Sequence, residues 1–100
     1  MRHADYLDGL RVTFLGEIAA AALARSFAKR DLAPRERKIC GMIERLETMT
    51  ADILTPLLAA PPSGQDIALA ISRGEASGRR LRNWAALVDH AAHALDRYVD

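Results

Sequence analysis

The sequence predicts an all-α protein, an antiparallel helical bundle of three main helices in a single domain, residues 1–100. Apolar residues recur every three or four positions along three segments, which is the period of a helix with one buried face. Nowhere does the sequence alternate apolar and polar residues as a strand would. Short connections separate the segments and favour antiparallel neighbours. We expect the helices at about 4–30, 35–58 and 65–99.

The first predicted helix has an alanine-rich centre, EIAAAALA, with a high helix propensity. Alternating steps of four and three residues place one stripe along its face: Leu10, Phe14, Glu17, Ala21, Ala24 and Ala28. Glu17 stands in this stripe where an apolar residue is expected. Its carboxylate would face other helices, where a charge is costly unless it is paired, protonated or bound to metal.

The second predicted helix begins at Pro34, because a proline in the first turn lacks only an N–H that has no helical partner. An amphipathic pattern then continues to about residue 58, carried by Ile39, Met42, Ile43, Leu46, Met49, Ile53, Leu54, Leu57 and Leu58. Pro56 should kink or end the helix near residues 53–55. The run AAPPSG at 59–64 predicts a loop.

Ser63, followed by Asp66, predicts the N-terminal cap of the third helix. One apolar face then continues from Ile67 to about residue 99. The stretch GEASG at 74–78 is the weak point of this segment and has two interpretations. It is either a close crossing with another helix or a break into a short and a long helix. We expect one helix with a local irregularity there.

Composition limits the functions that this chain can have. A net charge of +1 gives no general attraction to nucleic acid or anionic lipid, so we expect neither as a partner. The N-terminus is too polar for a secretory signal, and the longest apolar run, 18–24, is far shorter than the ~20 residues of a membrane span. With a single cysteine, we expect a cytoplasmic protein. Because alanine buries little area, we also expect a homodimer that covers the remaining apolar surface.

Three carboxylates form the first candidate site. Glu44 and Glu47 lie three residues apart on the second predicted helix and are neighbours on its surface. In an antiparallel hairpin the middle of the first helix lies opposite the middle of the second, which brings Glu17 toward them. Carboxylates that converge between helices bind iron or manganese in bundle proteins. The alternative is that Glu17 pairs with an arginine such as Arg45 and that the other two carboxylates are solvated.

The segments YLDGLRVTFLGEIAAAAL and ERLETMTADILTPLL resemble the first helical hairpin of small bacterial ferritin-like (rubrerythrin-like) proteins. The third segment, with Gly78, Trp84 and the ending LDRYVD, is similar to their third helix. The resemblance covers most of the chain. It implies that Glu17 matches the metal ligand of the first helix and that Glu47 matches the ligand of the second.

Two departures from that family bear on the site. Thr50 stands where the family has a histidine, and the sequence ends where the fourth helix of the family, with its second glutamate and histidine, begins. The resemblance therefore implies either a metal site shared by two chains or a scaffold whose site has decayed. We expect decay.

Three further groups are candidates for chemistry. His90 and His93 are three residues apart and could share a metal, but they lie beside the apolar stripe, so we expect a polar or half-exposed surface. Cys40 has apolar helical neighbours, so we expect a small packed residue. A basic cluster could bind phosphate or an acidic partner but lacks interleaved aromatics, so we expect solvated helix surface there, and the same for residues 35–38. This cluster consists of Arg73, Arg79, Arg80 and Arg82.

The sequence therefore predicts a non-catalytic structural or interaction protein on a ferritin-like scaffold, without a cofactor. The alternative is an iron or manganese site built across a homodimer from Glu17 and Glu47 of each chain, with oxygen or peroxide chemistry. A third hypothesis is a binding module with an apolar groove between helices for a small molecule or a partner helix.

Overall fold

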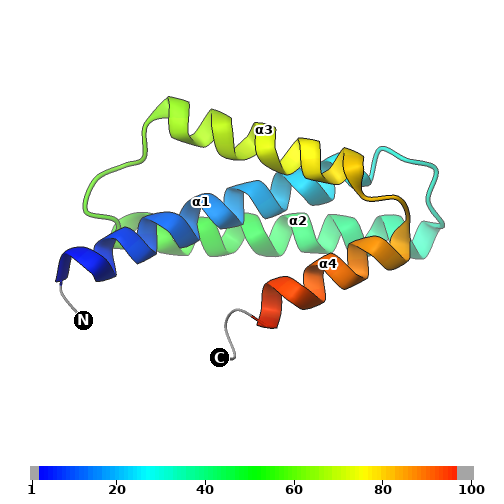
Figure 1. The fold of residues 1–100 in the computed structure, drawn as a ribbon, viewed down its shortest axis with the longest axis horizontal. Coiled ribbons are helices and arrows are strands. Elements are labelled where there is room, and N and C mark those ends of the chain that lie inside the picture. The colour runs from blue at the N-terminus through cyan, green and yellow to red at the C-terminus, as the bar shows by residue number, and fades with distance from the viewer. Residues whose placement is uncertain (1–2, 97–100) are drawn as a thin grey trace.

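Four α-helices and one short 3₁₀ helix make up the described part of the chain, residues 3–96 of a computed structural model in which the side chains of 6–93 are described (Figure 1). The elements are α1 (His3–Phe27), α2 (Pro34–Leu54), η1 (Thr55–Leu57), α3 (Gly64–Arg80) and α4 (Trp84–Asp96). Residues 3–96 contain no strand, so the predicted all-α class is confirmed.

The helix α1 is the centre of the fold. The chain runs up, down and up through α1, α2 and α3, and both α2 and α3 pack on α1 (Figure 1). They make at most marginal contact with each other. The molecule measures 45 × 31 × 21 Å. Its shortest extent is about two helix diameters of ~10–12 Å, so the helices form a flattened, open bundle.

Three predicted helix boundaries are confirmed. Pro34 is the first residue of α2, and α2 ends at Leu54, two residues before Pro56, where the chain tightens into η1. The helix therefore ends at the proline and does not continue to the predicted residue 58. The Ser63 hydroxyl caps α3, because its oxygen accepts a hydrogen bond from the Asp66 N–H at 3.1 Å.

The prediction of one helix over 65–99 is wrong. The chain forms α3 and α4, and the break lies at residues 81–83 rather than at 74–78. Leu81 adopts an extended backbone (ψ 126°) and packs on the core. The Asn83 side chain then caps α4 by accepting a hydrogen bond from the Ala86 N–H at 2.9 Å. Residues 97–99 of the predicted helix lie outside the described part of the chain.

The two glycines of α3 form a close crossing with α1. A Cβ at Gly74 would collide with the main chain of Ala19, and a Cβ at Gly78 would lie 2.8 Å from the Leu23 carbonyl oxygen. The Ser26 hydroxyl of α1 donates a hydrogen bond to the Glu75 carbonyl of α3 at 3.1 Å. The two backbones can approach this closely only because the residues between them are small.

The core lies at the end of the molecule where α4 begins. Its central side chains, Leu23, Phe27, Cys40 and Leu87, come from three helices. The Trp84 ring of α4 packs on Phe27 with 6.4 Å between the ring centroids. From residue 88 to residue 93 every side chain of α4 is exposed, so α4 is held by its first turn.

Candidate functional site

Two of the three predicted metal ligands lie on the side of α2 that faces α1. Glu44 and Glu47 share this inner face with Cys40 and Ala51, which are both buried. Glu44 forms an ion pair with Arg25 of α1, with 3.2 Å between guanidinium nitrogen and carboxylate oxygen. One of the three predicted carboxylate ligands, Glu44, is therefore already paired with an arginine.

The Arg25–Glu44 ion pair places these two residues near one another across the α1–α2 hairpin. Glu17 lies eight residues before Arg25, so in an antiparallel pair it is level with about residue 52, eight residues after Glu44. Glu47 is five residues away from that level, or about 7 Å along the helix axis. By this residue count the two half-buried carboxylates, Glu17 and Glu47, lie at different levels along α1 and α2.

The described residues of one chain do not form a two-metal carboxylate site. Among the described residues, no group of three or more His, Cys, Asp and Glu side chains is placed to hold a metal ion. Thr50, at the position of the family's histidine, donates its hydroxyl hydrogen to the Leu46 carbonyl at 3.0 Å.

Burial changes the acidity of two groups on the inner face of α2. Desolvation raises the pKa of the Glu47 carboxyl. Burial, with a smaller contribution from the Glu36 carboxylate, raises the pKa of the Cys40 thiol. Cys40 is 1% exposed and packs in the core, as predicted. A raised thiol pKa disfavours the thiolate, so Cys40 is a packing residue rather than a nucleophile.

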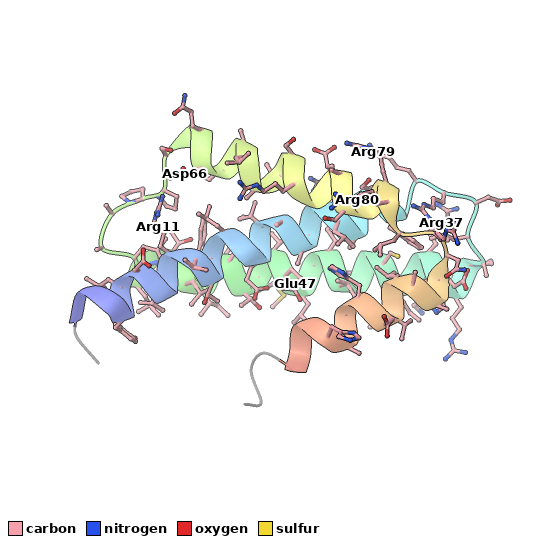
Figure 2. All side chains as sticks on the ribbon, viewed as in Figure 1. Arg11, Arg37, Glu47, Asp66, Arg79 and Arg80 are labelled. Carbon is pink, nitrogen blue, oxygen red and sulfur yellow. The ribbon has the colours of Figure 1, made fainter. Side chains whose placement is uncertain are left out.

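The remaining predicted candidates lie in solvent. His90 and His93 are exposed, and the ring of His93 contacts the Asp89 carboxylate at 3.6 Å within the same helix. The arginines of the basic cluster, Arg73, Arg79, Arg80 and Arg82, are also exposed. Figure 2 shows Arg79 and Arg80 at the same end of the molecule as Arg37.

At this basic end, two arginines bind the main chain where helices terminate. Arg37 donates hydrogen bonds to the carbonyls of Ala28 at 2.6 Å and Arg30 at 3.0 Å, just after α1. The Arg30 guanidinium bonds the Gly78 carbonyl at 2.7 Å, near the end of α3. Carbonyls at helix C-termini lack intrahelical partners, so these arginines stabilise the fold.

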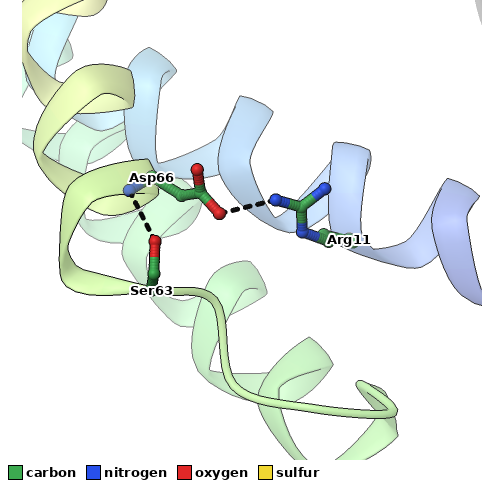
Figure 3. A network of polar contacts seen from close by, with 3 residues as sticks. All are labelled: Arg11, Ser63 and Asp66. Atoms are coloured by element: carbon green, nitrogen blue, oxygen red, sulfur yellow. Dashed lines mark hydrogen bonds and ion pairs between the residues drawn. The ribbon is translucent and has the colours of Figure 1, made fainter.

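At the opposite end, an ion pair joins α1 to the first turn of α3. The Arg11 guanidinium contacts the Asp66 carboxylate at 2.5 Å, next to the Ser63 cap (Figure 3). The hydrogen bond from Arg11 is the largest cause that lowers the pKa of Asp66. A shallow hollow at this corner is lined by α1 and by the loop 58–63. It is a structural corner of mixed polarity rather than an apolar groove between helices.

The outer face of α2 carries the largest apolar side chains of the helix. The outer stripe, as we name it, consists of Ile39, Met42, Leu46, Met49 and Ile53. The exposed fraction is 51% for Met42, 59% for Leu46, 60% for Met49 and 66% for Ile53. A shallow groove runs over this face and is lined by Ile43 and Arg45 together with four members of the stripe.

The orientation of α2 is the reverse of the usual one for an amphipathic helix. Carboxylates and small residues turn toward α1, while the outer stripe turns to solvent. The apolar pattern predicted for this helix is present, but most of its large members do not pack on the chain's other helices. Large apolar residues in a row that stays exposed are typical of a binding surface.

Comparisons with protein-family models, with curated protein sequences and with solved structures find no match to this chain. The ferritin-like resemblance therefore rests on the sequence motifs alone. In residues 3–96, no helix combines the length and the apolar character needed to cross a membrane.

Proposed function

We propose that this chain is a non-catalytic interaction protein that binds another protein surface through the outer stripe of α2. The exposure of Met42, Leu46, Met49 and Ile53 carries the proposal. Fully burying such a side chain contributes about 1.5–3 kcal/mol, and half or more of each is still exposed here. A partner that covers these four side chains would gain roughly 3–6 kcal/mol before the costs of association.

The chemistry of the inner face supports a non-catalytic role. The two groups there with shifted pKa values, Glu47 and Cys40, are both shifted by burial toward the neutral form. Among the residues with described side chains, the carboxyl outside this face with a shifted pKa is that of Asp66, which belongs to a helix cap and an ion pair. We also propose that the protein is cytoplasmic and has a ferritin-like scaffold whose metal site has decayed. The sequence motifs and the ion pair between Arg25 and Glu44 support this part of the proposal.

The test of this proposal is to replace the stripe and measure folding. The double variant Met42→Lys/Met49→Lys should keep the far-ultraviolet circular dichroism spectrum and the urea midpoint of the unchanged chain in dilute solution, because both side chains are more than half exposed. Leu23→Lys, which buries a charge in the core, is the positive control for unfolding. Loss of helix in the double variant would assign the stripe to the fold itself and overturn the proposal.

The second candidate function is iron or manganese binding across a homodimer. The position of the half-buried Glu47 beside Glu44 on the inner face of α2 is the observation that favours it. Elemental analysis of the size-exclusion peak, after anaerobic loading with ferrous iron, is the test. About one or more ions per chain pair that are lost in Glu17→Ala and kept in the exposed control Asp89→Ala would establish this function and displace the first. Metal at background would exclude it.

A further inference from the structure

We infer that the partner of the outer stripe is a second copy of this chain, paired through α2 in an antiparallel arrangement about a two-fold axis. This inference rests on the proposed function and names the partner of the same surface. Three features carry it: the spacing of the stripe, the charges along one edge of it, and the position of the carboxylates away from it.

The spacing of the outer stripe is that of a coiled-coil seam. Steps of three, four, three and four residues join Ile39 to Ile53, which is the a and d repeat that lets two helices pack side by side. A two-fold axis midway between Leu46 and Met49 sets Leu46 against the partner's Met49. The same axis sets Met42 against the partner's Ile53. Each exposed member of the stripe then meets another, so the interface is self-complementary and closes as a dimer.

The charges along one edge of the stripe select the antiparallel direction. Arg45 and Asp52 are seven residues apart, so both lie on the same edge, and both are exposed. In the antiparallel pair, Arg45 neighbours the partner's Asp52, and the symmetry makes this ion pair twice. In a parallel pair, Arg45 would instead neighbour the partner's Thr50, without an opposite charge. The ion pairs between described residues of one chain involve neither Arg45 nor Asp52.

The inner carboxylates take no part in this interface. Glu47 lies on the face of α2 that is turned to α1, while the stripe is turned away. Pairing through the stripe therefore leaves the Glu47 carboxyls of the two chains on opposite sides of the paired helices. This dimer is distinct from the dimer that a shared metal site would need, and the two can be told apart by experiment.

The first experiment measures the mass of the full chain by sedimentation velocity over a range of concentrations. The unchanged chain should be a dimer that dissociates on dilution. Leu46→Lys should weaken dimerisation by about 100-fold or more, because it places two lysines at the centre of the seam. The matched control is Leu69→Lys, which changes an exposed leucine of α3 (50% exposed) and should leave the dimer unchanged. Circular dichroism of each variant should show the same helix content.

The second experiment tests the antiparallel direction by exchanging charges. Arg45→Asp and Asp52→Arg should each weaken the dimer by about 10-fold, since each replaces two attractive pairs by two repulsive ones. The double variant should recover the affinity of the unchanged chain, because the exchanged charges meet again across the two-fold axis. Additive weakening in the double variant would overturn the antiparallel arrangement.

Two outcomes of the first experiment overturn the inference: a chain that is a monomer at all concentrations, or a dimer that survives Leu46→Lys. Neither outcome touches the proposed function, which is judged by the folding of Met42→Lys/Met49→Lys in dilute solution. If that variant unfolds, the proposed function fails whatever the oligomeric state. The two failures are therefore distinguishable.

Discussion

The interface between α1 and α3 and the outer stripe of α2 are built from opposite kinds of residue. Gly74, Gly78 and Ala19 bring two backbones together, and no large side chain lies between them. Leu46 and Met49, in contrast, are among the largest apolar side chains of the molecule and stand in solvent. Small residues therefore form the close crossing of α1 and α3, and a row of large ones forms a surface that the chain's own helices leave uncovered.

The difference follows from the alanine-rich face of α1. The fully buried residues that α2 presents to α1 are the small Cys40 and Ala51, and the half-buried Glu44 and Glu47 lie beside them. The large apolar residues of α2 then turn to the other side. A position in a packed interface and a matched position outside it should therefore respond differently to the same kind of substitution.

The largest difference in the free energy of unfolding is expected between two leucines that are each replaced by alanine. Leu23→Ala should reduce the free energy of unfolding by about 3 kcal/mol, because Leu23 is 9% exposed in the core. Leu46→Ala should change it by less than about 0.5 kcal/mol in dilute solution, because Leu46 is 59% exposed. Urea denaturation followed by circular dichroism measures both. Equal losses would mean that the outer stripe is part of the core.

The next contrast is between two glycines. Gly74→Ala should destabilise the protein by about 2 kcal/mol, because the new Cβ meets the main chain of Ala19, which cannot rotate away. Gly16→Ala should stabilise it by about 0.5–1 kcal/mol, because Gly16 is within α1 and nothing lies within 4 Å of its added Cβ. Thermal unfolding shows the opposite signs. A stabilising Gly74→Ala would contradict the close crossing of α1 and α3.

The cap of α4 should give a smaller and more local effect. Asn83→Ala removes the acceptor for the Ala86 N–H and should cost α4 about 1 kcal/mol. Because the described side chains of α4 beyond its first turn are exposed, the loss should appear as faster amide hydrogen exchange in α4, with the exchange of α1 unchanged. Asn83→Asp keeps an acceptor oxygen and should keep the protection. Faster exchange across the whole protein would show that α4 unfolds with the core.

The smallest effect is the pH dependence contributed by Glu47. Its folded pKa is raised by burial, so its contribution to stability is full below the unfolded pKa and is lost as pH rises through the folded pKa. Glu47→Gln removes that loss. It should stabilise the protein at pH 7 by up to about 0.5 kcal/mol, after allowance for solvent screening, and should be neutral below about pH 4. Urea midpoints across this range measure the difference.

Asp66 should show the opposite dependence and serves as the control. Arg11 holds its folded pKa low, so its contribution is present above the unfolded pKa and is lost as pH falls through the folded pKa. Asp66→Asn should therefore be slightly destabilising at pH 7 and neutral in strong acid. If both substitutions shift the midpoint in the same direction at pH 7, the assignment of the two environments is wrong.

Helix ends are the part of this fold that the sequence predicts well, because they depend on neighbouring residues. Pro34, Pro56 and Ser63 each act within one turn of the chain, and each boundary lies where the residue type requires. Asn83 is a signal of the same kind. The glycines at 74 and 78 compete with it in the sequence, since a glycine pair is equally consistent with a break and with a close crossing.

Pairings between helices are the part that the sequence does not predict. Glu44 meets Arg25, 19 residues away on another helix, and which turn meets which depends on the loop and on the tilt of α2. The sequence also does not predict which face of α2 packs on α1. An apolar stripe that pairs with another chain has nearly the same spacing as one that packs on the core. The metal site and the ferritin-like relationship stay predictions.

The contact of Trp84 with Phe27 gives this protein a built-in optical reporter. Trp84 is the one tryptophan of the sequence, and it lies where α4 joins the core. Its emission therefore follows the detachment of α4, while the ellipticity of the chain follows all four helices together. A shift in emission at a urea concentration where ellipticity is still native would identify α4 as a separately unfolding unit.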